Sequence, residues 1–118
     1  MTQLSPYLRF DEGKCKEAMR FYQECLGGSL SLTEVRETPV ARRMPTELQD
    51  HIMHANLTSG NLVLLGSDTS CEEGYIKGNT FVLSLECSSE DEIRNTYSKL
   101  ANGGSATYPI APSFWGGL

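Results

Sequence analysis

Residues 21–29 read FYQECLGGS and residues 97–105 read YSKLANGGS, so an aromatic residue and an identical Gly-Gly-Ser recur 76 positions apart. Before each Gly-Gly pair, apolar residues follow one another at three- and four-residue spacing, as along the buried stripe of an amphipathic helix. Paired glycines then supply the left-handed backbone that ends a helix. The pattern predicts one helix over residues 14–26 and a second that begins in the acidic segment 88–92 and runs to Asn102.

Alternation of polar and apolar residues predicts strands on either side of these helices. We expect strands over residues 5–10, 29–36, 52–58 and 61–65 in the first half of the chain, and over 80–86 and 105–110 in the second. The polar segment 37–50 contains two prolines and is predicted to be a crossover loop with one helical turn at 45–50. The element order is βαβββ followed by βαβ, which makes an α+β fold.

The two halves are related beyond the glycine stops, because Leu8 and Phe10 return as Leu83 and Leu85 at an offset of 75. We therefore expect a single domain, 1–118, built of tandem βαβββ modules that form a curved mixed sheet. The first module spans 1–68 and an incomplete second module spans 80–118. Residues 106–118 alone follow the second Gly-Gly-Ser, so this module is expected to stop after its first strands.

A sheet without its closing strands exposes unpaired backbone edges and apolar surface, which proteins normally cover. Two explanations stay open at this point. Either the chain is a shortened piece, or a second subunit completes the sheet. The second explanation makes a homodimer the expected assembly.

Charge and composition narrow the classes of partner. The chain has 118 residues, a formal charge of −5 and a pI near 4.9, without a run of basic residues, so nucleic acid is not an expected partner. The N-terminus lacks signal-peptide character, and no apolar run is long enough to cross a membrane, so we expect a cytosolic protein. The four cysteines form no CxxC pair and are predicted to be reduced thiols, with Cys15 and Cys25 on the apolar face of the first helix.

Five short segments carry a resemblance to a known family, and the similarity covers essentially the whole chain. They are Ser5-Pro6-Tyr7-Leu8, Phe21-Tyr22 with Leu26-Gly27-Gly28, Ile52-Met53-His54-Ala55, Leu65-Gly66-Ser67-Asp68, and Phe114-Trp115-Gly116. Together they resemble the PhnB-like branch of the vicinal oxygen chelate superfamily, which includes glyoxalase I, bleomycin-resistance proteins and extradiol dioxygenases. Members of that branch usually continue into further strands after the Phe-Trp-Gly segment, whereas this chain ends at Leu118.

The resemblance also allows a test for a metal site. In metal-using relatives, His or Glu ligands come from the first and last strands of each module, and the matching positions here are Ser5, Thr80 and a position near Leu64. None of these side chains is a good ligand for zinc, nickel or iron. We therefore expect no metal and no cofactor. The two histidines, His51 and His54, are three residues apart and are expected on opposite faces of a strand.

The face of the sheet away from the helices is the candidate ligand pocket. It is expected to carry Tyr7, Arg9, His54, Asn56 and Ser84, with Trp115 covering either the pocket mouth or a dimer interface. Arg9 could bind an anionic ligand and His54 could act as an acid or base. Both also have simpler explanations, because Arg9 could pair with an acidic residue and His54 could be a hydrogen-bonded structural residue.

Three functions stay open from the sequence. The leading hypothesis is a metal-independent, glyoxalase-like protein that binds a small organic molecule. The alternatives are a metal-dependent lyase or dioxygenase of the same superfamily, and a truncated dimerising domain without catalytic activity. The sequence shows no nucleophile–base arrangement, phosphate-binding glycine motif or methyltransferase cofactor loop, so catalytic residues are not assigned.

Overall fold

A computed structural model describes residues 2–68, 80–104 and 111, which fall into two compact units, Met1–Lys77 (unit 1) and Gly78–Leu118 (unit 2). Unit 1 contains strands β1 (Tyr7–Arg9), β2 (Ser29–Glu34), β3 (Ile52–Ser59) and β4 (Leu62–Ser67), and helix α1 (Cys15–Leu26). Three short 3-10 helices, η1 (Val35–Glu37), η2 (Pro39–Arg43) and η3 (Thr46–Leu48), join β2 to β3. Unit 2 contains helix α2 (Glu90–Ala101). The predicted strand at 105–110 lies outside the described residues.

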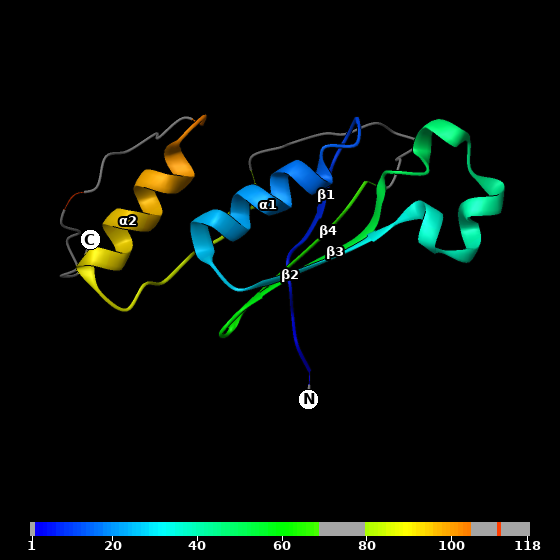
Figure 1. The fold of residues 1–118 in the computed structure, drawn as a ribbon. Helices are drawn as coiled ribbons and strands as arrows, with labels where there is room; N and C mark the ends of the chain where they lie inside the picture. The colour runs from blue at the N-terminus through cyan, green and yellow to red at the C-terminus, as the bar shows by residue number, and fades with distance from the viewer. Residues whose placement is uncertain (1, 69–79, 105–110, 112–118) are drawn as a thin grey trace. The chain divides into compact units, whose positions relative to one another are not determined.

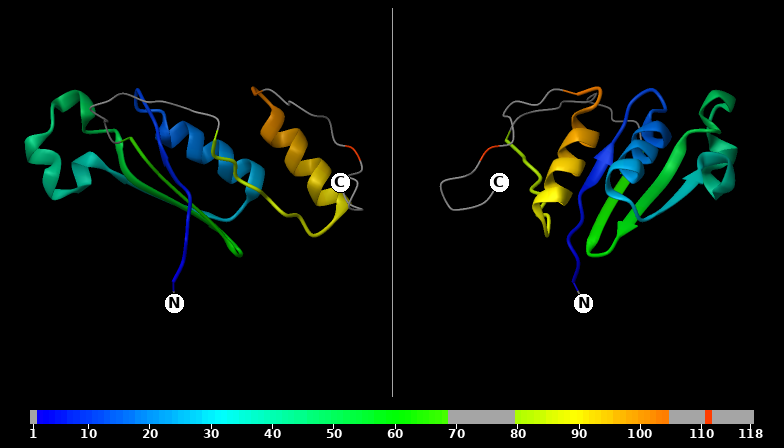
Figure 2. Two further views of the ribbon diagram at one scale, coloured as in Figure 1. Left: turned by 180° about the vertical axis from the view of Figure 1, so that it is seen from behind. Right: turned by 60° about the vertical axis from the view of Figure 1, so that its left-hand side comes forward.

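The four strands form a mixed sheet in the order β1-β4-β3-β2. Strand β1 runs parallel to β4, and β3 is antiparallel to both β4 and β2. Helix α1 lies along one face of this sheet, while η1–η3 lie beyond one end of β2 and β3 (Figures 1 and 2). The predicted α+β class and the βαβββ order of the first module are confirmed.

The core of unit 1 lies between α1 and the sheet. Fully buried Cys15 and Met19 of α1 pack with Ile52, Ala55 and Leu57 of β3. Each large apolar side chain buried in this way contributes about 1.5–3 kcal/mol. Ala55 and Leu57 of β3 are buried on the side of α1, whereas Met53, expected on the same face from alternation, is half-buried. Both cysteines of α1 are buried as predicted.

One residue breaks the alternation that the sequence predicts for β3. Thr33 pairs with His54 but Glu34 pairs with Ile52, so Met53 is an extra residue that forms a β-bulge. The bulge turns Ile52 into the core, where it is 1% exposed. Strict alternation would place Ile52 on the same face as His54 and Asn56, but alternation does not continue through a bulge.

A glycine allows α1 to approach β4 closely. A Cβ atom on Gly66 would lie 3.2 Å from Met19 Sδ and 3.2 Å from Phe10 Cε2, tighter than ordinary van der Waals contact. Any larger residue would have to push α1 away from the sheet or displace these side chains. Gly66 therefore sets the distance between the helix layer and the sheet layer.

The carboxylate of Asp68 ties three elements together at one edge of this core. One oxygen accepts a hydrogen bond from the backbone N–H of Cys15 (2.9 Å), at the start of α1, and the other accepts from the N–H of Ile52 (2.8 Å). The N–H of Asp68 in turn donates to the Ile52 carbonyl (2.8 Å). A carboxylate at a helix N-terminus is favoured because the free N–H groups and the helix dipole are positive there.

Both helices end as the repeated Gly-Gly-Ser predicts. Gly27 and Gly28 follow α1 with φ of 75° and 93°, and Gly103 follows α2 with φ of 79°, all in the left-handed region that favours glycine. At Gly28 a Cβ atom would also lie 2.6 Å from Ser59 Cβ, because the chain passes close to the β3–β4 hairpin. The first stop therefore also fixes how α1 leads into β2.

The strand predicted over residues 80–86 is wrong, since residues 81–87 have no regular secondary structure. Their apolar side chains are exposed, with Phe81 at 86%, Val82 at 85% and Leu83 at 55%. Alternation favours an extended backbone, but a strand also needs a neighbour to pair with. Among the described residues of unit 2, α2 is the one regular element and offers no such neighbour.

We predict that Asp68→Ala lowers the free energy of unfolding by about 2–4 kcal/mol, because it removes two hydrogen bonds to a charged acceptor. Asp68→Asn, which keeps one acceptor oxygen, should give an intermediate loss. Urea denaturation measures both. Asp50→Ala, which removes an exposed carboxylate from the loop before β3, is the control and should leave stability nearly unchanged. Equal stability of the two alanine variants would contradict the role assigned to Asp68.

The buried thiol of Cys15 predicts a loss of stability at alkaline pH. Burial, with a further contribution from the charge of Asp68, raises the pKa of Cys15 from 9.0 to about 12. The folded state therefore keeps a proton that the unfolded state loses between these two values, so stability falls as pH rises through that window. Denaturation curves measured across this window should show a smaller decline for Cys15→Ala than for the native chain.

Leu64→Ala is the control for this measurement, because it shortens the same core without removing a titrating group. It should lower stability by a similar amount at every pH. Parallel pH profiles for the native chain and Cys15→Ala would show that Cys15 does not cause the decline.

Candidate functional site

The face of the unit 1 sheet opposite α1, called the open face here, is formed by alternate residues of the four strands. Strand pairing places Tyr7 beside Leu65, Leu65 beside Asn56, and Asn56 beside Ser31 in one row across the sheet. The neighbouring rows contain Arg9 with Ser67, His54 with Thr33, and Val63 with Thr58 and Ser29. The open face therefore has eleven residues: Tyr7, Arg9, Ser29, Ser31, Thr33, His54, Asn56, Thr58, Val63, Leu65 and Ser67.

Two rings form the aromatic part of the open face. The centroids of Tyr7 and His54 are 6.2 Å apart, with 41° between the ring planes. This distance is within the range of favourable aromatic pairs. Tyr7 is 48% exposed and His54 is also exposed, so both rings remain accessible in the described structure. Two side chains from non-adjacent strands, β1 and β3, thus meet above β4.

Asn56 supplies a directed polar group next to these rings. Its Oδ1 accepts a hydrogen bond from Thr58 Oγ1 at 2.8 Å, which fixes the orientation of the amide. The amide nitrogen is then the donor that the side chain can offer to a ligand. Asn56 is half-buried on a central strand, so its position is well defined by the sheet.

The structure brings four of the six predicted site residues onto the open face: Tyr7, Arg9, His54 and Asn56. Arg9 is exposed at the end of β1 and pairs in register with Ser67. Ser84 lies in the irregular segment of unit 2 and is exposed, so it belongs to a different unit from the other four. Trp115 lies outside the described residues.

The comparisons with known proteins agree with this fold. A family model described as 3-demethylubiquinone-9 3-methyltransferase matches residues 2–115. The chain belongs to this family. It is the PhnB-like glyoxalase family, so the resemblance noted from the sequence is confirmed.

A solved structure supports the same assignment. The crystal structure of protein PA1353 from Pseudomonas aeruginosa has 34% sequence identity and a TM-score of 0.83, over 98% of this chain and 84% of that chain. A search of curated proteins finds no match.

The positions that hold metal ligands in metal-using relatives of the superfamily carry no ligand here. Ser5 precedes β1, Thr80 is exposed in unit 2, and Leu64 is 7% exposed in the core under α1. Leu65, next to it on the open face, is also aliphatic. In the described part of the chain, no three residues among His, Cys, Asp and Glu lie close enough together to hold a metal ion.

The two histidines lie in different surroundings, and His51 is outside the strand on which His54 lies. His51 precedes β3 and packs against the turn before α1, where a Cβ on Gly13 would lie 2.9 Å from His51 Nε2. His54 faces Tyr7 on the open face. The histidines therefore cannot ligate one ion together.

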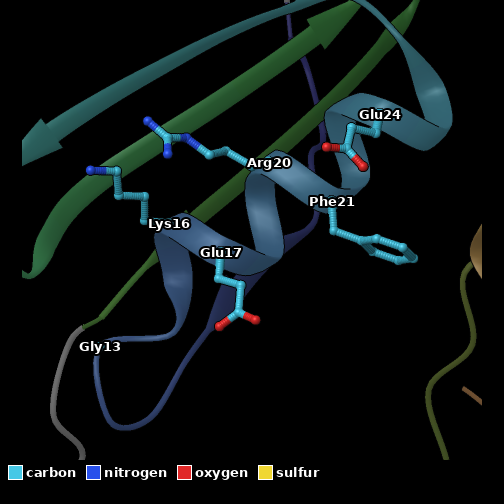
Figure 3. A pocket seen from close by; sticks show the side chains of 6 residues that line it. All are labelled: Gly13, Lys16, Glu17, Arg20, Phe21 and Glu24. Atoms are coloured by element: carbon cyan, nitrogen blue, oxygen red, sulfur yellow. The ribbon is translucent and has the colours of Figure 1, made fainter. Parts of the chain in front are cut away.

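A shallow depression on the outer surface of α1 is not a comparable site. Its volume is about 650 Å³, and it is lined by Gly13, Lys16, Glu17, Arg20, Phe21 and Glu24. Lys16 and Arg20 extend to one side of the helix and Phe21 to the other (Figure 3). All of these residues come from one helix and its preceding turn, so among the described residues nothing forms an opposite wall around a ligand.

Sequence reasoning did not identify the hydroxyl residues of β2 as part of the site. Ser31 and Thr33 lie on the open face because they pair with Asn56 and His54. Their alternation with Leu30 and Leu32 could have indicated this face, once β2 was placed beside β3.

Neither described helix is long and apolar enough to span a membrane.

Proposed function

We propose that this protein binds a small organic molecule on the open face of unit 1 without a metal ion. The observation that carries the proposal is the Tyr7–His54 pair, whose accessible rings lie next to the oriented amide of Asn56. Ligand sites typically combine aromatic and apolar surface with a few directed polar groups, and the open face has this composition. The opposite face of the same sheet is filled by the core under α1.

The four predicted site residues of unit 1 each have a defined role in this proposal. Tyr7 and His54 contact a flat part of the ligand, and Asn56 donates a hydrogen bond. Leu65 of β4 is the apolar residue between Tyr7 and Asn56. Arg9 supplies positive charge at the end of β1.

We propose binding alone and assign no reaction. We also propose that the protein acts in the cytosol. Family membership alone does not assign a substrate, because one fold serves many chemistries. A metal-dependent lyase or dioxygenase would contain stoichiometric nickel, zinc or iron after purification and would lose activity to a chelator. Elemental analysis of the purified chain distinguishes this alternative.

We predict that small aromatic compounds perturb the amide NMR signals of Tyr7, His54 and Asn56 in the full chain. Tyr7→Ala and His54→Ala should each weaken binding by about two- to tenfold, the value of one aromatic contact of about 0.5–1.5 kcal/mol. Glu24→Ala, on the outer surface of α1, is the control and should leave binding unchanged. Signals that move along α1 instead, or no binding by any compound tested, would exclude the proposed site.

We also propose that the protein is a homodimer. Phe81, Val82, Leu83 and Leu85 are 86%, 85%, 55% and 45% exposed, and a run of exposed apolar residues of this kind is normally covered by a partner. A second copy of the chain could pair with this extended segment and cover it.

Sedimentation velocity tests the dimer directly. The native chain should sediment as a dimer at micromolar concentration, and Phe81→Asp combined with Leu83→Asp should convert it to a monomer, because two charges cannot be buried in an apolar contact. The double variant Glu90→Asp with Asp91→Glu, which alters nearby residues but keeps the charge, should remain dimeric. A stable monomeric native chain would contradict the proposal.

A further inference from the structure

We infer that the ligand of the open face is a flat molecule without positive charge, and that aromatic anions are its preferred class. The inference rests on the proposed function and adds the charge and shape of the ligand. Two observations support it. The strands place uncharged polar, aromatic and basic groups on the open face, and they direct carboxylates to the other side of the sheet.

The eleven residues of the open face include no carboxylate, although the whole chain contains 15 Asp and Glu residues. Described acidic residues of unit 1 occur instead in the turn before α1, along α1, in the segment between β2 and β3, at the last residue of β2 and just after β4. A ligand with a positive charge would therefore be desolvated on the open face without a counter-charge from these four strands. Such burial of an unpaired charge is unfavourable.

Two carboxylates, Glu34 and Asp68, directly follow residues of the open face, and strand alternation directs both to the other side of the sheet. Glu34 follows Thr33 in β2 and pairs with Ile52, which points into the core on the α1 side. Directly opposite residues of a ladder point to the same face, so Glu34 leaves the open face and contacts Arg36 Nε at 3.5 Å. Ordinary alternation along β2 is therefore responsible for the direction of this charge, while the bulge in β3 reorients Ile52.

Asp68 follows Ser67 in the same way at the end of β4. Its two oxygens are bound to the N–H groups of Cys15 and Ile52, so its charge is directed to the start of α1. Asp68 and Glu34 thus border two different strands, and each is held on the α1 side of the sheet. Strand alternation thus keeps both negative charges off the face that carries His54.

The groups that remain on the open face suit a flat anion. Arg9 is positively charged, and Ser31, Thr33 and Asn56 offer uncharged hydrogen-bonding groups beside the two rings. Leu65 lies between Tyr7 and Asn56 in one row of the sheet. Arg9 already makes an interaction within the structure. The preference therefore depends first on the missing carboxylates and only second on the Arg9 charge.

Three probes of equal size and different charge test the inference: benzoate, benzamide and benzylammonium. Titrations of the full chain at low ionic strength, followed by the amide signals of Tyr7, His54 and Asn56, give a dissociation constant for each. We expect benzoate to bind about tenfold more tightly than benzylammonium, with benzamide between them and with the ratio falling as salt screens the charges.

A variant with an added carboxylate should reverse this order. Ser31→Glu places a negative charge on the exposed edge strand of the open face, next to Asn56. It should weaken benzoate and strengthen benzylammonium. Thr46→Glu, which adds the same charge in η3, is the matched control and should keep the native order.

The outcomes separate the inference from the proposed function. Benzylammonium binding as tightly as benzoate at these residues would overturn the charge preference and leave the binding site itself supported. Equal effects of Ser31→Glu and Thr46→Glu would also overturn it, because net charge would then explain the order. Failure of all three probes to bind at the open face would overturn both the inference and the proposed function.

Discussion

The hydrogen bonds of the Asp68 carboxylate are the constraint on which the rest of unit 1 depends. They join the start of α1, the start of β3 and the end of β4, which are separated by up to 53 residues along the chain. Apolar packing holds α1 against the sheet but is not directional. The two backbone bonds to Asp68 add direction, because they fix where the helix begins relative to the strands. The positions of Cys15 and Met19 in the core follow from that starting point.

The same arrangement explains why the open face is composed as it is. Strands β3 and β4 must present Ala55, Leu57 and Leu64 to α1, so their alternate residues are directed to the other side. Those residues are His54, Asn56, Val63 and Leu65. Core packing and the composition of the candidate site are therefore one consequence of strand register, and a shift by one residue would exchange them.

Regular features of the sequence predicted much of this fold. The helix over residues 14–26 was readable because its apolar spacing is periodic and its Gly-Gly stop is local, and α1 spans Cys15–Leu26. The bulge at Met53 was not readable, because a single extra residue leaves no distinct pattern. The role of Asp68 was also hidden, since its partners are distant in sequence. The strand predicted at 80–86 had the right alternation, but pairing depends on neighbours that periodicity does not specify.

The parallel pairing of β1 with β4 has a consequence for the order of folding. The β3–β4 hairpin joins neighbouring segments, whereas Tyr7 must meet Leu65 from the far end of the unit. Local contacts generally form before distant ones, because closing a long loop costs more entropy. Docking of the first strand is thus expected to be a late event. Tyr7 then reaches His54 only when this last step is complete, and partly folded chains lack the paired rings altogether.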